Sequence, residues 1–165
     1  MYVDTLYRGI KKQNYLNGEW VEGYLAKGIF GERSAERPDS HWCIIRKEEV
    51  TKDNDNEYCL RSYEVCQYSI CKFTGYIDNN KNKIWVDSIV KITCSDKEFA
   101  LPCDYYLVTY DEEAGSYILQ NLYDHDGPYN LSNILMFDNY TLEVVGDLYH
   151  DSGLIHGEEK HNIHG

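Results

Sequence analysis

The sequence contains no run of 18 apolar residues, so we expect no helix that crosses a bilayer. Its first residues hold no basic segment followed by an apolar core, so a secretory signal is not expected either. The glycine-rich phosphate loop, the Walker pattern and the zinc-protease helix are also missing from the sequence. We therefore expect a protein of the cytoplasm that has no membrane partner and needs no cofactor or metal.

Basic residues are scarce in the last part of the chain. Residues 104–165 hold 12 acidic groups and a single base, Lys160, whereas residues 1–103 hold 16 acidic and 15 basic groups. Nearly all of the net charge of −12 therefore lies after residue 103. Such a surface repels the phosphates of nucleic acids and of membrane headgroups. This distribution favours a basic protein partner or a cation site.

Cysteine pairs with C-x-x-C spacing are absent, although the chain has six cysteines. That spacing marks many zinc and redox sites, and disulfides are rare in a reducing compartment. Cysteines in apolar strand-like runs behave as small hydrophobic residues. We expect free thiols that bind no zinc at Cys43, Cys59, Cys66, Cys71, Cys94 and Cys103.

The sequence does contain short segments of period-2 alternation that are separated by turn residues. Asn17-Gly18 is the strongest turn signal and predicts an N-terminal hairpin. Residues 105–110 and 116–120 predict two strands around a hairpin-length loop. The segment from Asn130 to Phe137 fits either a helical turn or a strand. The pattern predicts a mainly β protein, a small antiparallel β-barrel or sandwich-like domain with little helix.

The domain organisation follows from the same pattern. We expect a single β-rich domain over residues 1–150. Residues 47–57 are rich in Asp, Asn, Glu and Lys and are expected to form a flexible loop within it. Residues 151–165 are expected to form a polar, His-containing C-terminal tail.

The chain is organised around residues 72–92, which read KFTGYIDNNKNKIW and continue VDSIVKI. The order of an aromatic-Thr-Gly segment, an Asp-x-Asn turn, an Ile-aromatic pair and Ile-Val-Lys resembles the signature of the YopX family of phage and prophage proteins. Residues 17–25, NGEWVEGYL, resemble the opening of that family. The resemblance covers about residues 1–25 and 63–155, around a variable insert. It implies a YopX-like fold and brings no particular reaction with it.

Two positions depart from the family pattern. Asn80-Lys81 stands where the family favours Asn-Gly, so Asn80 or Lys81 must adopt the positive φ that glycine would supply. Val86-Asp87-Ser88 replaces a Glu-Gly-Asp triplet, so both carboxylates are absent from their usual positions, while Asp87 places one between them.

Alternation along the signature strand and along residues 141–149 predicts which side chains are buried. In the latter strand, we expect Glu143 and Asp147 to face the solvent and Leu142 to face the core. The six side chains expected to be buried are Phe73, Ile84, Val90, Ile92, Val144 and Leu148.

The loop Asp124-His125-Asp126 is a candidate for chemistry, because flanking carboxylates can orient an imidazole as a general base or a ligand. The sequence shows no nucleophile motif beside it, and a solvated turn is the plainer interpretation. The histidines of the tail could gather a divalent metal, but adventitious affinity of a polar terminus is the plainer interpretation there. We therefore assign no catalytic residue and no metal ligand.

Many of the 16 tyrosines crowd the acidic part of the chain. Tyrosine anchors protein interfaces, and its mixture with Asp and Glu suits a surface that bears Lys or Arg. The candidate binding residues are Tyr106, Tyr110, Asp111, Glu112, Glu113, Tyr117, Asp124, His125 and Asp126.

The leading hypothesis is a non-catalytic protein-binding or regulatory module of a phage or prophage, acting in the bacterial cytoplasm on a basic protein surface. Homo-oligomerisation is left open. One alternative is a small hydrolase or metal-dependent enzyme that uses the Asp124-His125-Asp126 loop. The other is a nucleic-acid-binding small barrel, which the charge disfavours.

The thiol hypothesis is directly testable. Thiol titration of protein purified under reducing conditions should count six free thiols, and metal analysis of the same sample should find no zinc. A stoichiometric zinc ion would contradict it.

Overall fold

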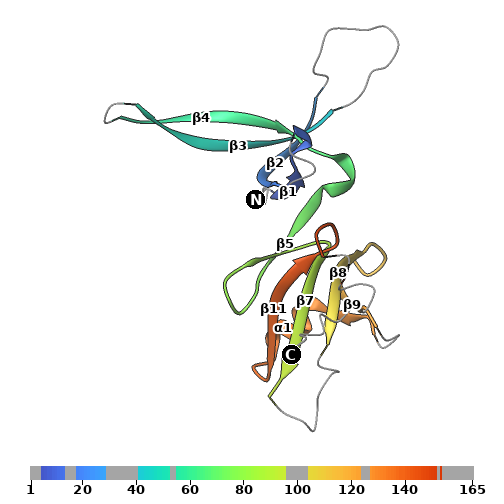
Figure 1. Ribbon diagram of the computed structural model, residues 1–165. Coiled ribbons are helices and arrows are strands. Elements are labelled where there is room, and N and C mark those ends of the chain that lie inside the picture. The colour runs from blue at the N-terminus through green and yellow to red at the C-terminus, as the bar shows by residue number, and fades with distance from the viewer. Residues whose placement is uncertain are drawn as a thin grey trace, which may run out of the picture. The chain divides into compact units, whose positions relative to one another are not determined.

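The computed structural model describes residues 5–13, 18–28, 41–52, 55–95, 104–123, 127–151 and 153. The chain separates into two compact units, Met1–Phe73 and Thr74–Gly165, where we had expected one domain. The mainly β fold with antiparallel strands and little helix is confirmed (Figure 1). In the described part of the chain neither sheet closes into a barrel, and no helix could span a membrane.

The first sheet has the order β4-β3-β2-β1-β5-β6, and its strands as far as the start of β5 belong to the first unit. They are β1 (Tyr7–Ile10), β2 (Trp20–Gly28), β3 (His41–Lys52), β4 (Asp55–Glu64) and the start of β5 (Cys71–Ile77). The predicted N-terminal hairpin is confirmed, because β1 and β2 pair from Tyr7↔Gly23 to Ile10↔Trp20. The core of this unit is formed by Val21, Ile44 and Val65. A short 3-10 helix, η2 (Gln67–Ser69), connects β4 to β5.

Residues 47–52 and 55–57, which we expected to belong to a flexible loop, lie in strands β3 and β4. The β3–β4 ladder runs through that segment as far as Lys52↔Asp55, so the strands form one long hairpin (Figure 1). Strand β2 pairs with β3 from His41 to Ile45. Beyond Ile45, the described parts of β3 and β4 form a two-stranded ribbon. A ribbon with water on both faces suits polar side chains at every position, so its composition looked like that of a loop.

The second unit is an antiparallel sheet in the order β10-β9-β8-β7-β11, preceded by the β5–β6 hairpin. Its elements are β6 (Lys83–Trp85), β7 (Ser88–Cys94), β8 (Tyr105–Asp111), β9 (Ser116–Asn121), β10 (Tyr129–Asn130), α1 (Leu131–Met136) and β11 (Tyr140–Asp147). The ambiguous segment after Asn130 is thus helical. Asn130 caps this helix, because its Oδ1 accepts a hydrogen bond from Ser132 N at 3.0 Å.

Of the six side chains that we predicted to be buried, three are completely buried. Ile84, Val90 and Ile92 are completely buried, whereas Phe73, Val144 and Leu148 are half-buried. The completely or almost completely buried cluster comprises Ile84, Val90, Ile92, Tyr106, Val108, Leu119, Leu131, Ile134 and Leu142.

Asp147 was expected to face the solvent, and that was wrong. The pairing of β11 with β7 shifts between Val144↔Val90 and Gly146↔Ile89, so Val145 is an extra, exposed residue. Such a bulge reverses the alternation beyond it. The Asp147 side chain therefore turns inward, where Oδ1 accepts hydrogen bonds from the backbone N–H groups of Tyr149 at 2.9 Å and His150 at 3.0 Å.

Among the residues that the structure describes, two other than glycine have a positive φ. Lys81 has φ 69°, as the departure from Asn-Gly predicted, and Asp87 has φ 65° at the position where the family pattern has glycine. The Asp87 N–H donates to Val108 O at 2.8 Å, and its side-chain Oδ2 accepts from the Tyr149 hydroxyl at 2.9 Å. The turn between β6 and β7 is therefore held from two sides.

Replacing Lys81 with glycine should stabilise the second unit. The left-handed conformation costs a residue with a Cβ roughly 1 kcal/mol, so Lys81→Gly should raise the free energy of unfolding by about 0.5–1 kcal/mol. The control Lys83→Gly, in the extended backbone of β6, should lower it by a similar amount. Urea unfolding followed by tryptophan fluorescence measures both changes. A lower stability for Lys81→Gly would contradict the strain argument.

Candidate functional site

The carboxylate of Asp78 is the hub of the signature turn. Its side chain is 3% exposed. Oδ1 accepts from the backbone N–H groups of Asn80 at 2.9 Å and Asn82 at 2.7 Å. Oδ2 accepts from Asn82 Nδ2 at 3.0 Å and from Val144 N, on β11, at 2.9 Å. One carboxylate thus closes the turn and ties it to a strand 66 residues away.

The neighbouring residue completes this attachment. Asn79 N donates to Leu142 O at 3.1 Å, and Asn79 Oδ1 accepts from Leu142 N at 2.8 Å. These bonds occupy backbone groups on the outer edge of β11, where another strand would otherwise pair. We call the contacts of Asp78 and Asn79 with β11 the signature clamp.

The ionisation of Asp78 follows from this arrangement. Burial of the carboxylate would raise its pKa, but the hydrogen bonds from Val144, Asn82 and Asn80 outweigh burial and hold the pKa below its ordinary value. All four hydrogen bonds go to the charged form. The acid of the signature is therefore engaged in structure, and its low pKa comes from those donors.

A groove lies beside the clamp. Its volume is about 460 Å³, and it is bounded by the β5–β6 hairpin and by the segment from α1 into β11. Tyr76, Ile77 and Phe137 line it and are 36%, 47% and 57% exposed, respectively. Its lining also includes Lys81, Asp138 and Tyr140. We call this hollow the signature groove.

A second hollow of about 220 Å³ shares one residue with the signature groove. Tyr76 lines both hollows, and Tyr117 and Ser116 on β9 line the second. The Tyr117 ring lies 5.0 Å from the ring of Tyr110, measured between centroids. Aromatic side chains therefore follow one another from the β8–β9 turn to the signature groove.

The predicted tyrosine-acid site is partly assembled. Tyr110 is 44% exposed, and Glu112 and Glu113 are exposed on the β8–β9 turn beside it. Asp111 is half-buried, and its Oδ1 accepts from the N–H groups of Glu113 at 2.9 Å and Ala114 at 3.0 Å. Asp111 thus shapes the turn that presents the two glutamates.

Tyr106 was wrongly placed among the binding residues. Its side chain is completely buried in the core of the second unit, with its ring edge-on to Tyr129 at 6.0 Å. Alternation along β8 puts Tyr106 on the inner face, while both faces of the strand carry tyrosines. Asp124, His125 and Asp126 lie outside the described residues, as does most of the tail.

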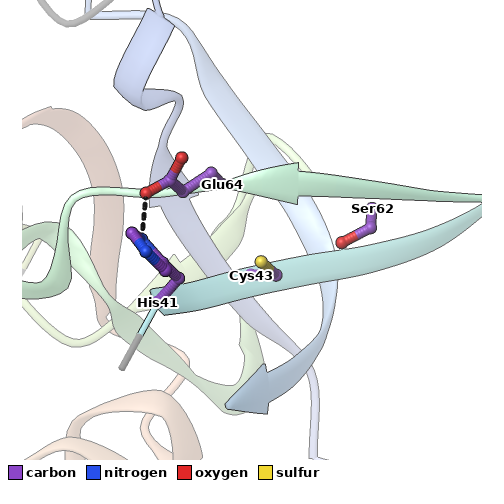
Figure 2. Close-up of a pocket in the computed structure, with 4 residues that line it drawn as sticks. All are labelled: His41, Cys43, Ser62 and Glu64. Atoms are coloured by element: carbon purple, nitrogen blue, oxygen red, sulfur yellow. Dashed lines mark hydrogen bonds and ion pairs between the residues drawn. The ribbon is translucent and has the colours of Figure 1, made fainter. Parts of the chain in front are cut away.

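A polar pocket in the first unit was not predicted. His41 and Cys43 on β3 face Ser62 and Glu64 on β4 around a hollow of about 280 Å³ (Figure 2). His41 Nδ1 lies 2.6 Å from Glu64 Oε1, which also accepts from Lys12 Nζ at 2.7 Å. The only sequence signal was the placement of His41 and Cys43 two residues apart on one face of a strand.

The Glu64 carboxyl contacts two side-chain nitrogens, Lys12 Nζ and His41 Nδ1. The hydrogen bond from Lys12, followed by that from His41, holds the pKa of the Glu64 carboxyl below its ordinary value against the effect of burial. Cys43 is almost completely buried and carries a free thiol. Among the residues that the structure describes, no three His, Cys, Asp or Glu side chains are placed to hold a metal ion.

The fold and these sites define a mainly β protein of two antiparallel units, the second of which is built around the signature clamp. The chain belongs to the YopX family, because the family model described as YopX protein matches residues 33–156, about three quarters of its length. This range includes residues 33–62, most of the segment that had been treated as a variable insert. It does not include residues 1–25, where part of the resemblance had been placed.

Two further comparisons complete the picture. A crystal structure of protein EF1440 from Enterococcus faecalis is similar, with 17% sequence identity and a TM-score of 0.48. The similarity covers 92% of this chain and 96% of that chain. No curated protein matches the sequence.

Replacing Asp78 with asparagine tests the signature clamp. Asp78→Asn leaves N–H donors without a charged acceptor and should lower the free energy of unfolding at neutral pH by about 1–3 kcal/mol. In the wild type, the contribution of Asp78 is complete above the unfolded-state pKa of about 3.9 and is lost as the pH falls through the lower folded-state pKa. The stability of the variant should therefore fall less steeply in acid.

Urea unfolding at a series of pH values measures both effects. Asp138→Asn is the matched control, because Asp138 is exposed, and it should change stability at neutral pH by less than about 0.5 kcal/mol. Equal effects of the two substitutions would show that Asp78 does not hold the turn to β11.

Proposed function

We propose that the protein is a non-catalytic protein-binding module of a phage or prophage, which acts in the bacterial cytoplasm on a basic protein surface. The observation that carries the proposal is the β8–β9 turn, where the exposed Tyr110 ring contacts the Tyr117 ring at a tilt of 59°, beside exposed Glu112 and Glu113. The mobile-element origin and the cellular compartment rest on the resemblance to the family and on the sequence.

Charge supports a basic partner. The second unit, residues 74–165, holds 16 acidic and five basic residues, whereas residues 1–73 hold 12 acidic and 11 basic residues. Like charges at this density repel one another, and a counter-charged partner relieves that repulsion. Acidic side chains at the rim of an interface steer association, while buried aromatic anchors slow dissociation.

The turn divides these two roles between different side chains. The side chain of Asp111 fixes the backbone of the turn by accepting hydrogen bonds from it. The turn therefore does not depend on the side chains of Glu112 and Glu113, whose charges are exposed. Tyr110 exposes a ring with few rotatable bonds, and this ring contacts the ring of Tyr117. The arrangement suits a flat, salt-sensitive protein contact.

Charge reversal on the β8–β9 turn should slow binding to a partner captured from host lysate and then purified. Glu112→Lys together with Glu113→Lys should reduce the association rate about tenfold at low salt, with less effect at high salt. Glu49→Lys, an exposed reversal on β3 in the first unit, is the control and should change it less than about twofold. Surface plasmon resonance over a range of salt concentrations measures these rates.

Removing the exposed ring should act on dissociation instead. Tyr110→Ala should speed dissociation about five- to thirtyfold, because truncating an interface tyrosine typically costs about 1–2 kcal/mol. Tight, salt-sensitive binding of the purified protein to DNA or RNA would overturn the proposal. Association and dissociation rates that neither the charge reversals nor Tyr110→Ala change would overturn it as well.

A further inference from the structure

The signature groove has the features of a site for one large apolar side chain. Its volume of about 460 Å³ lies in the range of small-ligand pockets, and an aromatic or long aliphatic side chain fills part of it. Three of its lining side chains, Tyr76, Ile77 and Phe137, expose a third or more of their surface to water. A single large exposed side chain is ordinary, but three around one hollow provide a joint apolar contact area, within a lining that also exposes polar atoms.

Hydrogen bonds and a ring contact hold the walls of the groove. One wall is the β5–β6 hairpin, which the signature clamp holds against β11 through Asp78 and Asn79. The other wall begins at Phe137, whose ring lies edge-on to Tyr140 at 6.3 Å. A preformed hollow costs little ordering when it is filled, so it favours binding of an anchor residue.

The charges around the groove indicate what flanks that anchor. Asp138 is exposed on the wall after α1, and Lys81 is exposed on the hairpin opposite. The surrounding unit is strongly acidic, with 16 acidic residues against five basic ones. A segment with Lys or Arg beside its anchor is attracted by this field and by Asp138, and only Lys81 opposes it in the groove lining.

We propose that the signature groove seats one aromatic or long aliphatic side chain of a partner protein segment whose neighbouring residues are Lys or Arg. This inference rests on the proposed function and adds a second contact to it, reached past Tyr76 from the β8–β9 turn. A second copy of this chain is a poor occupant, because two units of the same strong negative charge repel each other.

Short labelled peptides test the recognition chemistry without a known partner. The probes are Lys-Lys-Trp-Lys-Lys, Lys-Lys-Ala-Lys-Lys and Glu-Glu-Trp-Glu-Glu, and fluorescence anisotropy measures their binding to the full chain. The first should bind about tenfold or more tightly than either of the others, because it alone has both anchor and charge. Equal binding of the tryptophan and alanine peptides would overturn the inference.

Two neighbouring residues provide a matched pair of variants. Phe137→Ala removes a wall of the groove and should weaken binding of the tryptophan peptide about fivefold or more. Met136→Ala is the control, because Met136 is 79% exposed and does not line the groove, and it should have less than a twofold effect. Circular dichroism of both variants checks that they are folded.

The two charged walls should respond with opposite signs. Asp138→Lys should weaken binding of the basic tryptophan peptide about three- to tenfold, and Lys81→Glu should strengthen it by a similar factor. Changes of the same sign would overturn the assigned polarity. A rise in peptide affinity on deletion of residues 154–165 would identify the chain's own tail as the occupant and overturn the partner assignment.

The experiments separate this inference from the proposed function. If Glu112→Lys with Glu113→Lys slows partner binding while Phe137→Ala leaves both partner and peptide binding unchanged, the groove assignment fails and the proposed function stands. If the peptides bind as expected and no basic partner responds to the charge reversals on the β8–β9 turn, the proposed function fails.

Discussion

The second unit depends on one buried carboxylate that satisfies donors from two distant parts of the chain. Asp78 closes its own turn and also bonds to the backbone of Val144, so the β5–β6 hairpin cannot leave β11 without exposing N–H groups that have lost their acceptor. This accounts in physical terms for the Asp and for two of the Asn residues in the signature turn. The acid accepts, while Asn82 contributes two donors and Asn79 both donates to and accepts from β11. Because the clamp holds the hairpin against β11, the hairpin also forms one wall of the signature groove.

Local pattern was enough to predict most strands, because alternation and turn residues act within a few positions. The positive φ at Lys81 was predictable for the same reason. Prediction failed where a single inserted residue changes everything after it, as Val145 does for Asp147. It also failed on the β3–β4 ribbon, whose composition is set by water on both faces rather than by a core. Tyr106 shows a third limit, since tyrosine suits either face of a strand.

The candidate sites differ in how far the sequence could reveal them. Exposure of Glu112 and Glu113 follows from their place in a tight turn, so the charged part of the proposed binding face was predictable. The signature groove was not, because its two walls are separated by more than 50 residues in the sequence and are brought together by tertiary contacts such as the clamp. The pairing of His41 with Glu64, 23 residues apart, likewise depends on the register of β3 against β4. Register is set by the whole ladder and by its turn, not by the residues that it brings together.

The long hairpin of the first unit has a consequence for how the protein opens. Among the described strands, β3 pairs beyond Ile45 with β4 alone, whereas nearer the sheet it also pairs with β2. A two-stranded ribbon without a third strand or a packed face is only marginally stable in water. Its amide protons can therefore exchange with solvent through a local opening that leaves Val21 and Ile44 packed. The β3–β4 pair of the first unit thus has two levels of stability. The less stable part is the two-stranded end, which lies farthest from the core.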